Sequence, residues 1–522
     1  MTDAPEEWRE TAIFLSTPDA YGQPDPVQVI DTSISRVFLA GACAYKIKKP
    51  VKLVFLDFST ADLRREDCVR EVALNRRTAP SIYLGAIAIT READGRLALD
   101  GKGAAVEWAV QMQRFDNEAL LDHMASHGGL THALIARLAR NIAVFHAAIP
   151  PEYDAGGVEN FRRTLLNNDA EYRNFPAEIF PAAAIHALGE ASLAALDAQA
   201  ILMNARKAAG WVRHCHGDLH LANIFCLDGE PTPFDCIEFS DAIAKIDVLY
   251  DLAFLLMDLW RRGLKSLANH CLNQYFAHLT PDSAWACIEG MALLPLFLST
   301  RAGVRAFVMA RTSLSQPDNA QLIPEARDFF TLAHGFLRPA PPQMIAVSGF
   351  SGSGKSVLAR ALAPAIGVPP GALILRSDEI RKQLAGVPLL APLPSAAYTP
   401  ESSARVYGSI LERARTALRA GHSVIADAVY ARPEERAAIG AVAVDIGAPF
   451  QGLWLDAPPE LLSSRVGARS GDASDANPEI VRQQLGYDIG AIDWPRIDAS
   501  GSPQTTVANA RKQLGQGTGL SA

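Results

Sequence analysis

Apolar and polar residues alternate with a period of two along the first part of the chain. This alternation is typical of strands with one buried face. It predicts three short strands of an antiparallel sheet and two more strands further on, at residues 27–33, 36–41, 43–51, 82–90 and 105–114. Between the third and fourth strands, residues 60–78 are rich in Arg and Glu. They follow Ser59 or Thr60 as a helix N-cap, which predicts a helix.

The middle of the chain has a mostly helical pattern. Residues 117–210 and 246–335 predict helices, and the second stretch is interrupted by Pro281 and Pro295. Between the two stretches, residues 212–240 contain turn residues and short apolar runs, which predict a compact segment with short strands.

A Pro-rich stretch, RPAPPQ at 338–343, precedes a change of pattern and predicts a stiff linker. Beyond it, the apolar runs MIAVSG, ALILRSD, HSVIADA and FQGLWLDA alternate with helical segments. That alternation is typical of a parallel sheet with crossover helices. We therefore expect an α+β domain at 1–337, an α/β domain at 344–515 and a frayed tail at 516–522.

Composition narrows the class of protein. The 522 residues are 49% hydrophobic and 20% charged, which excludes disorder across the whole chain. The formal net charge of −8 argues against a dedicated nucleic-acid-binding protein, because such proteins carry a basic excess. Residues 341–522 are nearly neutral, so the acidic excess belongs to the first part of the chain.

The seven cysteines form no C-x-x-C pair and no zinc-ligand spacing. Such a scattered, odd set is typical of reduced thiols in the cytoplasm. The chain begins without an apolar signal segment, and the most apolar runs, 252–257 and 290–298, are shorter than a membrane span of about 20 residues. We expect a cytoplasmic protein with no membrane partner.

A glycine-rich segment follows directly after the strand MIAVSG and precedes a helical pattern. It fits G-x-x-x-x-G-K-[ST], the P-loop, in the strand-to-helix context that this motif requires. Its backbone N–H groups are expected to bind phosphates, its lysine to reach the β- and γ-phosphates, and its last hydroxyl to bind Mg²⁺. The candidate ATP-binding residues are Gly349, Ser351, Gly352, Ser353, Gly354, Lys355 and Ser356.

Later residues extend this candidate site. Asp378 ends the second strand of this region and is a candidate general base, with Arg381 placed to hold an acceptor anion. Asp427 ends the third strand, where a carboxylate can orient Mg²⁺. Arg465 and Arg469 lie one turn apart and suggest a lid that neutralises a transferring phosphoryl group. The structural alternatives are a helix cap, a strand-end turn and a solvated basic face.

A second constellation lies far upstream, in His216-Gly217-Asp218-Leu219-His220-Leu221-Ala222-Asn223 and in FDCIEF further on. In kinase chemistry one Asp orients the acceptor hydroxyl, while an Asn and a second Asp bind Mg²⁺. The spacing assigns the first role to Asp218 and the metal roles to Asn223 and Asp235, with Glu238 as a further acid. The alternative is a polar hairpin whose Asp and Asn residues serve turns.

The strand and helix upstream supply a candidate ion pair for the nucleotide. Lys46 is placed to contact the α- and β-phosphates, and Glu71 is placed to hold that lysine. Lys48 shares the same strand face, so the choice between the two lysines stays open, although Lys46 is favoured. Residues 110–115 are the expected adenine-binding hinge.

These motifs resemble two kinase families. Residues 343–515 resemble the P-loop small-molecule kinases, including gluconate kinase and the related zeta-toxin and polynucleotide-kinase-like proteins. Residues 25–335 resemble the aminoglycoside phosphotransferase and choline kinase branch of the protein-kinase-like fold, since HGDLHLAN is close to H-G-D-x-H-x-x-N. In that branch DVLYDLA at 247–253 is a helix with structural acids, here Asp247 and Asp251. The chain lacks the G-x-G-x-x-G of protein kinases, which argues against a protein kinase.

Taken together, the chain resembles bacterial two-domain proteins in which an aminoglycoside-phosphotransferase-like, bilobal domain is fused to an ATP-binding predicted kinase. The resemblance implies two sites that transfer the γ-phosphate of Mg·ATP to hydroxyl groups of small molecules. Alternatives are one active kinase beside a nucleotide sensor, a binding protein without turnover, and a zeta-toxin-like kinase of nucleotide sugars.

Overall fold

The computed structural model describes residues 5–53, 56–468 and 471–518. The chain divides into two compact units. The first unit comprises Met1–Leu130, Phe145–Gly156 and Gly210–Asp251. The second unit comprises Thr131–Val144, Gly157–Ala209 and Leu252–Ala522, so it contains helices from before the Pro-rich stretch as well as the region after it.

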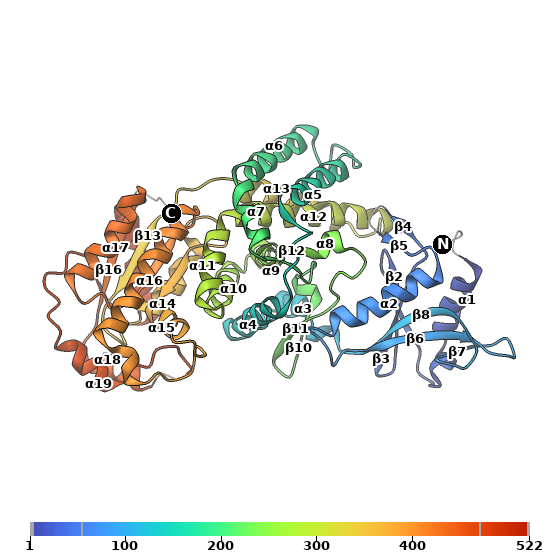
Figure 1. The fold of residues 1–522 in the computed structure, drawn as a ribbon, viewed down its shortest axis with the longest axis horizontal. Helices are drawn as coiled ribbons and strands as arrows, with labels where there is room; N and C mark the ends of the chain where they lie inside the picture. The colour runs from blue at the N-terminus through green and yellow to red at the C-terminus, as the bar shows by residue number, and fades with distance from the viewer. Residues whose placement is uncertain (1–4, 54–55, 469–470, 519–522) are drawn as a thin grey trace. The chain divides into compact units, whose positions relative to one another are not determined.

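The first unit is built on a six-stranded sheet in the order β1-β2-β3-β8-β6-β7, with antiparallel neighbours throughout (Figure 1). Its strands are β1 (Gln28–Asp31), β2 (Ser35–Ala40), β3 (Cys43–Lys48), β6 (Tyr83–Arg91), β7 (Leu97–Leu99) and β8 (Ala104–Gln113). The antiparallel strands predicted from the alternating pattern are therefore present. Strand β7 and helix α1 (Glu6–Leu15), whose Trp8 and Leu15 join the sheet's core, were not predicted.

Helix α2 (Ala61–Asn75) begins where Thr60 accepts a hydrogen bond from the backbone N–H of Leu63, as an N-cap does. The helix packs against β8 and β6. Short elements complete the unit: β4 (Lys52–Leu53), β5 (Leu56–Asp57), α3 (Leu121–Ser126), β9 (Val212–His214), β10 (Ile224–Leu227), β11 (Glu230–Pro233), α8 (Asp241–Ala244) and β12 (Lys245–Asp247). The segment 212–240 is thus a set of short strands, as its turn residues indicated.

Helices fill the rest of the middle region. They are α4 (His132–Ala148), α5 (Gly157–Tyr172), α6 (Ala182–Ala198), α7 (Ala200–Ala208), α9 (Val248–Arg261), α10 (Lys265–Ala277), α11 (Pro281–Gly290), α12 (Leu294–Ser315) and α13 (Leu322–Phe336). Pro281 and Pro295 each lie in the first turn of a helix, where a missing N–H costs little. The stretch Pro281–Ser315 is long and apolar enough for a membrane span, but 67% of its most apolar window is buried, as in a core helix.

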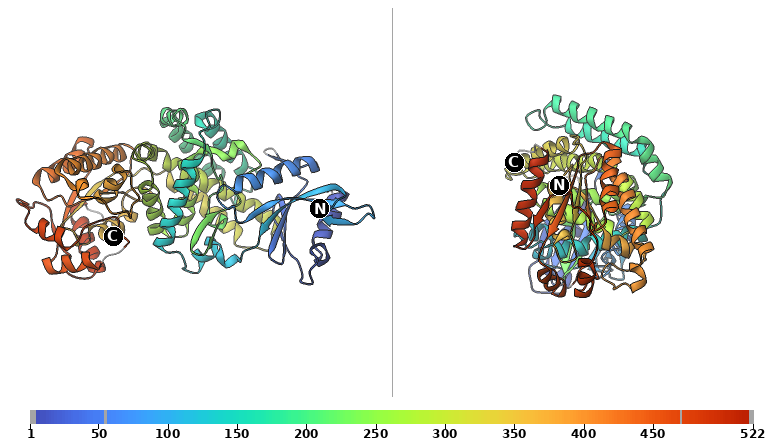
Figure 2. Two further views of the ribbon diagram at one scale, coloured as in Figure 1. Left: turned by 60° about the horizontal axis from the view of Figure 1, so that its bottom comes forward. Right: turned by 90° about the vertical axis from the view of Figure 1, so that its left-hand side faces the viewer.

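After the Pro-rich stretch, the chain forms a five-stranded parallel sheet in the order β14-β15-β13-β16-β17. The strands are β13 (Met344–Ser348), β14 (Leu373–Arg376), β15 (Val424–Asp427), β16 (Phe450–Asp456) and β17 (Arg496–Asp498). The helices are α14 (Lys355–Leu362), α15 (Ser377–Leu384), α16 (Pro400–Arg419), α17 (Pro433–Ile446), α18 (Pro459–Gly467), α19 (Pro478–Leu485) and α20 (Pro503–Thr518). They cover both faces of the sheet (Figure 2).

The predicted fold classes are confirmed: an α+β arrangement is followed by an α/β arrangement with a parallel sheet. One detail differs at the carboxy-terminal end. The pattern predicted a frayed tail at 516–522, whereas α20 continues to Thr518. Its inner face is held by the sheet's core, to which Val507, Ala510 and Leu514 belong.

Within the second unit, helix α10 covers the edge strand β14. Asn269 Nδ2 donates to the carbonyl of Ala372 at 3.0 Å, and Asn273 Oδ1 accepts from the backbone N–H of Ile374 at 2.7 Å. An exposed strand edge presents unsatisfied backbone groups, and these two amides pair with them. The helix therefore completes the parallel sheet at its edge.

We expect Asn273→Leu to lower the free energy of unfolding of this unit by about 1–3 kcal/mol, because the partly buried N–H of Ile374 loses its partner. Scanning calorimetry of the full chain would show the effect as a lower transition temperature. Asn509→Leu, on the exposed side of α20, is the matched control and should leave the transition in place. An unchanged transition for Asn273→Leu would contradict the role given to this amide.

Candidate functional site

Lys46, on strand β3, lies between two acids of the first unit. Its Nζ donates to Glu71 Oε1 on α2 at 2.9 Å and to Asp235 Oδ1 at 2.7 Å. The lysine side chain is 12% exposed and that of Asp235 is 43% exposed, so this end of the network is open to a ligand. The predicted ion pair between Lys46 and Glu71 is formed. Asp235, the predicted metal ligand, accepts a hydrogen bond from the same ammonium group.

Lys48 lies one pleat further along the same strand and is fully buried. Its Nζ is 2.9 Å from Asp67 Oδ2, 2.5 Å from Glu71 Oε2, and also pairs with Glu238 Oε1. Asp67, Glu71 and Glu238 offer carboxylate oxygens close enough to share a cation, and the ammonium of Lys48 lies among them. Glu71 therefore holds both lysines, one with each oxygen, and Lys46 is the one that contacts the exposed acid.

Burial and neighbouring charges shift the pKa values of Glu71 and Glu238 in opposite directions. Burial by itself raises the pKa of Glu71, but Lys46 and Lys48 outweigh it and lower that pKa to about 2. Burial raises the pKa of Glu238 to about 8, against the opposing effect of Lys48. Glu71 is thus a permanent anion between two cations.

We expect Lys48→Met to lower the free energy of unfolding by about 3 kcal/mol, because three buried carboxylates lose their cation. Lys46→Met is the matched control on the same strand face and should destabilise the protein less, while it weakens ATP binding. Thermal unfolding and binding of a non-hydrolysable ATP analogue would measure the two effects. A larger loss of stability for Lys46→Met than for Lys48→Met would contradict this division of roles.

The loop 216–223 presents Asp218 beside Asn223. Asn223 Nδ2 donates to Asp218 Oδ2 at 2.8 Å and to its main-chain oxygen at 3.0 Å. His220 Nε2 lies 3.4 Å from Asp218 Oδ2. The Asp218 side chain is 35% exposed, so its carboxylate is held in place and still accessible. This is the geometry expected of a group that orients an acceptor hydroxyl.

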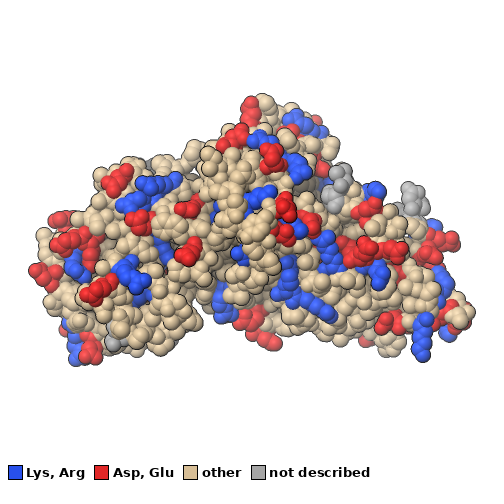
Figure 3. All heavy atoms as spheres, in the orientation of Figure 1, with Lys and Arg blue, Asp and Glu red and all other residues tan. Residues whose placement is uncertain are grey.

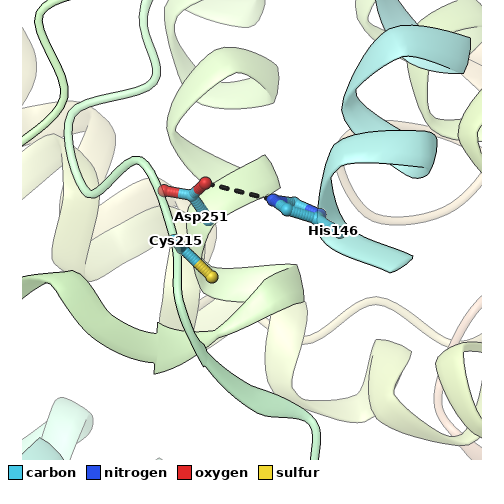
Figure 4. A group of neighbouring side chains, drawn as sticks. All are labelled: His146, Cys215 and Asp251. Carbon is cyan, nitrogen blue, oxygen red and sulfur yellow. Dashed lines mark hydrogen bonds and ion pairs between the residues drawn. The ribbon is translucent and has the colours of Figure 1, made fainter. Parts of the chain in front are cut away.

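The loop 216–223 is held at its start by the fully buried Asp251, which lies beside His146 and Cys215 (Figure 4). Asp251 accepts the backbone N–H groups of His216 at 3.1 Å and Gly217 at 2.8 Å, and His146 Nε2 lies 3.1 Å from its Oδ2. Cys215 lies next to the pair, with its Sγ directed at the carbonyl of Ile246. Asp251 therefore acts as a structural residue, as the sequence indicated.

Asp235 is held in a left-handed backbone conformation, φ 57°, which is costly for a residue other than glycine. The buried Tyr83 hydroxyl accepts the backbone N–H of Asp235 at 3.1 Å, and Asn75 Oδ1 accepts that of Cys236 at 2.9 Å. These two side chains fix the turn that points Asp235 at Lys46. Sequence reasoning missed both, because Tyr83 lies 152 residues away.

The oxygen atoms of Asn223 and Asp235 fit a magnesium ion, since amide and carboxylate oxygens are the ligands that this hard cation takes. In the second unit, Ser356 and Asp427 offer a hydroxyl and a carboxylate. Asp427 is buried, which raises its pKa, while the positive charges of Arg376 and Lys355 and the nearby Ser356 hydroxyl act against that rise. The predicted metal-side residues are thus of the right chemistry in both sites.

The P-loop of the second unit runs from the end of β13 into α14, as predicted. Gly349 has φ 130° and Gly352 has φ 84°. A Cβ at these positions would lie 2.5 Å from the carbonyl oxygen of Leu455 and 2.4 Å from that of Leu462. Only glycine fits such close backbone approaches. Lys355 Nζ, at the first position of α14, donates to the carbonyl of Phe350 at 3.1 Å, across the loop.

A cavity of about 630 Å³ opens beside this loop. Four side chains that line it carry buried polar atoms without a hydrogen-bond partner in the described part of the chain, namely Ser353 Oγ, Arg376 Nε, Arg381 Nε and Asp427 Oδ2. Buried polar groups are normally satisfied, so orphans gathered around one cavity indicate a place where a polar ligand binds.

Asp378 and Arg381, on α15, both line this cavity. Arg381 donates to the carbonyl of Ala397 at 2.7 Å, and its guanidinium stacks 4.8 Å from the ring centre of Tyr398. The side chain of Asp378 is 31% exposed and faces Arg376 across 3.9 Å. The predicted base and the predicted acceptor-side arginine therefore share one cavity with the P-loop.

Of the two arginines predicted to form a lid, one is bound to backbone carbonyls and the other is not described. Arg465, on α18, lines the cavity but donates to the carbonyls of Ala499 at 2.8 Å and Gly501 at 3.0 Å. Arg469 lies outside the described residues. Arg376, which the sequence analysis did not select, is the buried cation among the acids Asp378, Glu379, Asp427 and Asp472.

Three comparisons place the chain among known proteins. Residues 344–487 match the family described as AAA domain. Two mycobacterial proteins, Uncharacterized protein Rv2004c of Mycobacterium tuberculosis and Uncharacterized protein Mb2027c of Mycobacterium bovis, are each 31% identical over 499 residues. Those alignments cover 93% of this chain and 94% of each relative.

Solved structures of kinases are similar to portions of the chain. A choline/ethanolamine kinase family protein from Mesorhizobium loti is 14% identical with a TM-score of 0.37, covering 64% of this chain and 95% of its own. A sugar kinase from Janibacter is 24% identical with a TM-score of 0.25, covering 33% of this chain and 95% of its own.

Proposed function

The chain belongs to the family of the mycobacterial proteins Rv2004c and Mb2027c, and we propose that it is a two-site phosphotransferase. Each site would transfer the γ-phosphate of Mg·ATP to a hydroxyl group of a small molecule. In the first site Asp218 accepts the hydroxyl proton, Asn223 and Asp235 hold Mg²⁺, and Lys46 contacts the phosphates. In the second, Lys355 contacts the phosphates, Ser356 and Asp427 hold Mg²⁺, and Asp378 accepts the proton.

One observation carries the proposal. Lys46 touches Glu71 and Asp235 directly although 189 residues separate it from Asp235, and the amide of Asn223 touches Asp218. Contacts between these residue types are what phosphoryl transfer needs, because its catalysis rests on positioning and on charge stabilisation. The bound Mg²⁺ would neutralise the charge that develops on the phosphate oxygens.

The second site is supported by its cavity. The P-loop, Asp378 and Asp427 surround one space that is large enough for a nucleotide and an acceptor, since ligand pockets span roughly 300–1,000 Å³. The P-loop backbone and the amino-terminal end of α14 supply the phosphate-binding groups. The domain boundary at 338–343 stays a prediction.

Surface charge and free cysteines support small-molecule acceptors in the cytoplasm. On the face drawn in Figure 3, basic and acidic side chains are interspersed, and no broad basic area of the kind that binds nucleic acid is visible on that face. All seven cysteines are described and are free thiols, which are typical of a reducing compartment.

The test is ATP turnover with a panel of sugars, amino alcohols, aminoglycosides and nucleotide sugars as acceptors. Wild type, Asp218→Asn, Lys355→Met and the double variant would be compared. If each single variant loses activity on a different acceptor, both sites are kinases. A loss in only one single variant supports one kinase beside a nucleotide sensor, and full activity of both single variants on every acceptor refutes the proposal.

A further inference from the structure

Arg376 is the last residue of β14 and the register partner of Asp427, the last residue of β15. Parallel register brings the two side chains to the same end of the sheet, beside the P-loop. The Arg376 side chain is 6% exposed, and it lines the 630 Å³ cavity. A buried guanidinium in that place requires acids around it, and the structure supplies them.

Four carboxylates surround this one cation. Its Nη2 is 2.5 Å from Asp472 Oδ1 and 3.9 Å from Asp378 Oδ2. Its Nη1 is 3.7 Å from Glu379 Oε1, and its Nε is 3.8 Å from Asp427 Oδ2. Arg376 is therefore the group that links the candidate base Asp378 to the candidate metal ligand Asp427.

The ion pair between Arg376 and Asp427 is too long to include a hydrogen bond. Arg376 Nε and Asp427 Oδ2 are both buried, and neither has a hydrogen-bond partner in the described ranges. They face each other across 3.8 Å, which is too long for a hydrogen bond. Hydrogen bonds at catalytic sites are often long before the ligand binds and shorten afterwards, so this donor and acceptor are set to close when the cavity is filled.

A purely structural role does not explain this arrangement. A whole buried ion network can often be replaced by apolar residues without loss of stability, whereas removing its cation alone leaves the acids unpaired, so the fold alone does not require this set of charges. A structural pair would also be expected to make its hydrogen bond, whereas this one leaves two polar atoms unsatisfied. Arg413, by contrast, is a buried arginine of the same unit that donates to Gln383 Oε1 at 2.7 Å and lies outside the cavity lining.

We propose that Arg376 is a positioning residue of the second site, one that sets Asp378 and Asp427 in a common orientation for phosphoryl transfer. This role rests on the proposed function of that site. The sequence pattern had predicted that Arg465 and Arg469 supply the positive charge of this site. In this proposal Arg376 has a place among the charges of the site instead. Its planar guanidinium presents its donors in a rigid fork, which fixes the direction of each carboxylate more strictly than the rotating ammonium of a lysine does.

The first part of the test is turnover. Full-length protein carrying Asp218→Asn, so that ADP release reports on the second site, would be combined with Arg376→Met, Arg376→Lys or the control Arg413→Met. We expect Arg376→Met to lower kcat about 10²-fold with the KM for ATP within about threefold, since a misplaced catalytic group costs about that much. Arg376→Lys should recover part of the loss, and Arg413→Met should stay within about threefold of its parent.

The second part of the test does not depend on turnover. The ring of Trp454 on β16 lies 5.6 Å from that of Phe350 in the P-loop, edge to face. The resonance of Trp454 in 5-fluorotryptophan-labelled protein, assigned by its loss in Trp454→Phe, therefore reports on the second site alone. Mg²⁺ would be titrated against protein saturated with a non-hydrolysable ATP analogue.

In this titration Arg376→Met should bind Mg²⁺ as tightly as its parent or more tightly, because a cation beside Asp427 has been removed. Retained Mg²⁺ binding with lost turnover is the signature of positioning. The inference is overturned if turnover stays within about threefold, or if Mg²⁺ binding weakens in proportion to turnover, as a damaged fold would give. If Lys355→Met leaves ADP release unchanged, it is the proposed function of the second site that fails.

Discussion

Asp218→Asn is expected to lower turnover at the first site by about 10²–10⁴-fold, the range of a lost general base. The substitution keeps the shape of the side chain and its contact with Asn223 while it removes the carboxylate that accepts the hydroxyl proton. The KM for ATP should change little, because Lys46 and Asp235 are untouched. Steady-state kinetics with the first acceptor found in the panel would measure both constants.

The control for Asp218→Asn is Asp228→Asn, in the turn between β10 and β11. Asp228 has φ 52°, a conformation that asparagine tolerates as well as aspartate does. The same chemical change at that position should leave turnover and stability unaltered. If Asp218→Asn retains activity within about threefold of wild type, Asp218 is not the base and the kinase assignment of the first site is wrong.

Lys355→Met is expected to lower turnover at the second site by about 10²–10³-fold, by analogy with the loss of one preorganised charge-stabilising donor. Its ammonium lies across the P-loop, bound to the carbonyl of Phe350, and is placed to move onto a phosphate. Methionine keeps an unbranched, apolar stem of nearly the same length, so α14 should form normally. ADP release in the Asp218→Asn background would measure the loss.

Lys512→Met, on the exposed side of α20, is the control for Lys355→Met and should have no effect. The two principal variants also test one another. Their effects should fall on different acceptors and add in the double variant, because the catalytic residues belong to different units. If a single variant abolished turnover on every acceptor, the two sites would not be independent kinases.

Local pattern predicted much of the fold. The period-two runs located the antiparallel strands β1, β2 and β3, and the alternation of strands and helices after residue 343 predicted the parallel sheet. Both patterns are local, because the spacing of apolar residues within a short segment indicates which face of a strand or helix is buried. Helix α1 was not predicted, although Trp8, Ala12 and Leu15 recur at the spacing of a buried helix face.

Motif spacing predicted the candidate site residues for a similar reason. The P-loop and the segment 216–223 each carry their chemistry within eight consecutive residues, so the residue types and their order are visible in the sequence. The pairing of Lys46 with Glu71 was also anticipated. That Glu71 holds Lys48 with its second oxygen was not, because two lysines on one strand face look equivalent until the burial of each is known.

By itself, then, the sequence determined the two fold classes, the two motifs at 216–223 and 349–356, and the residue types available to each. Only the tertiary structure decided which lysine faces the open end of the first site, that Tyr83 and Asn75 fix the turn at Asp235, and that Arg376 lies among four carboxylates. The physical reason is the range of the interactions. Periodicity and motifs record what lies within a few residues along the chain, whereas charge balance and burial depend on partners that only folding brings together.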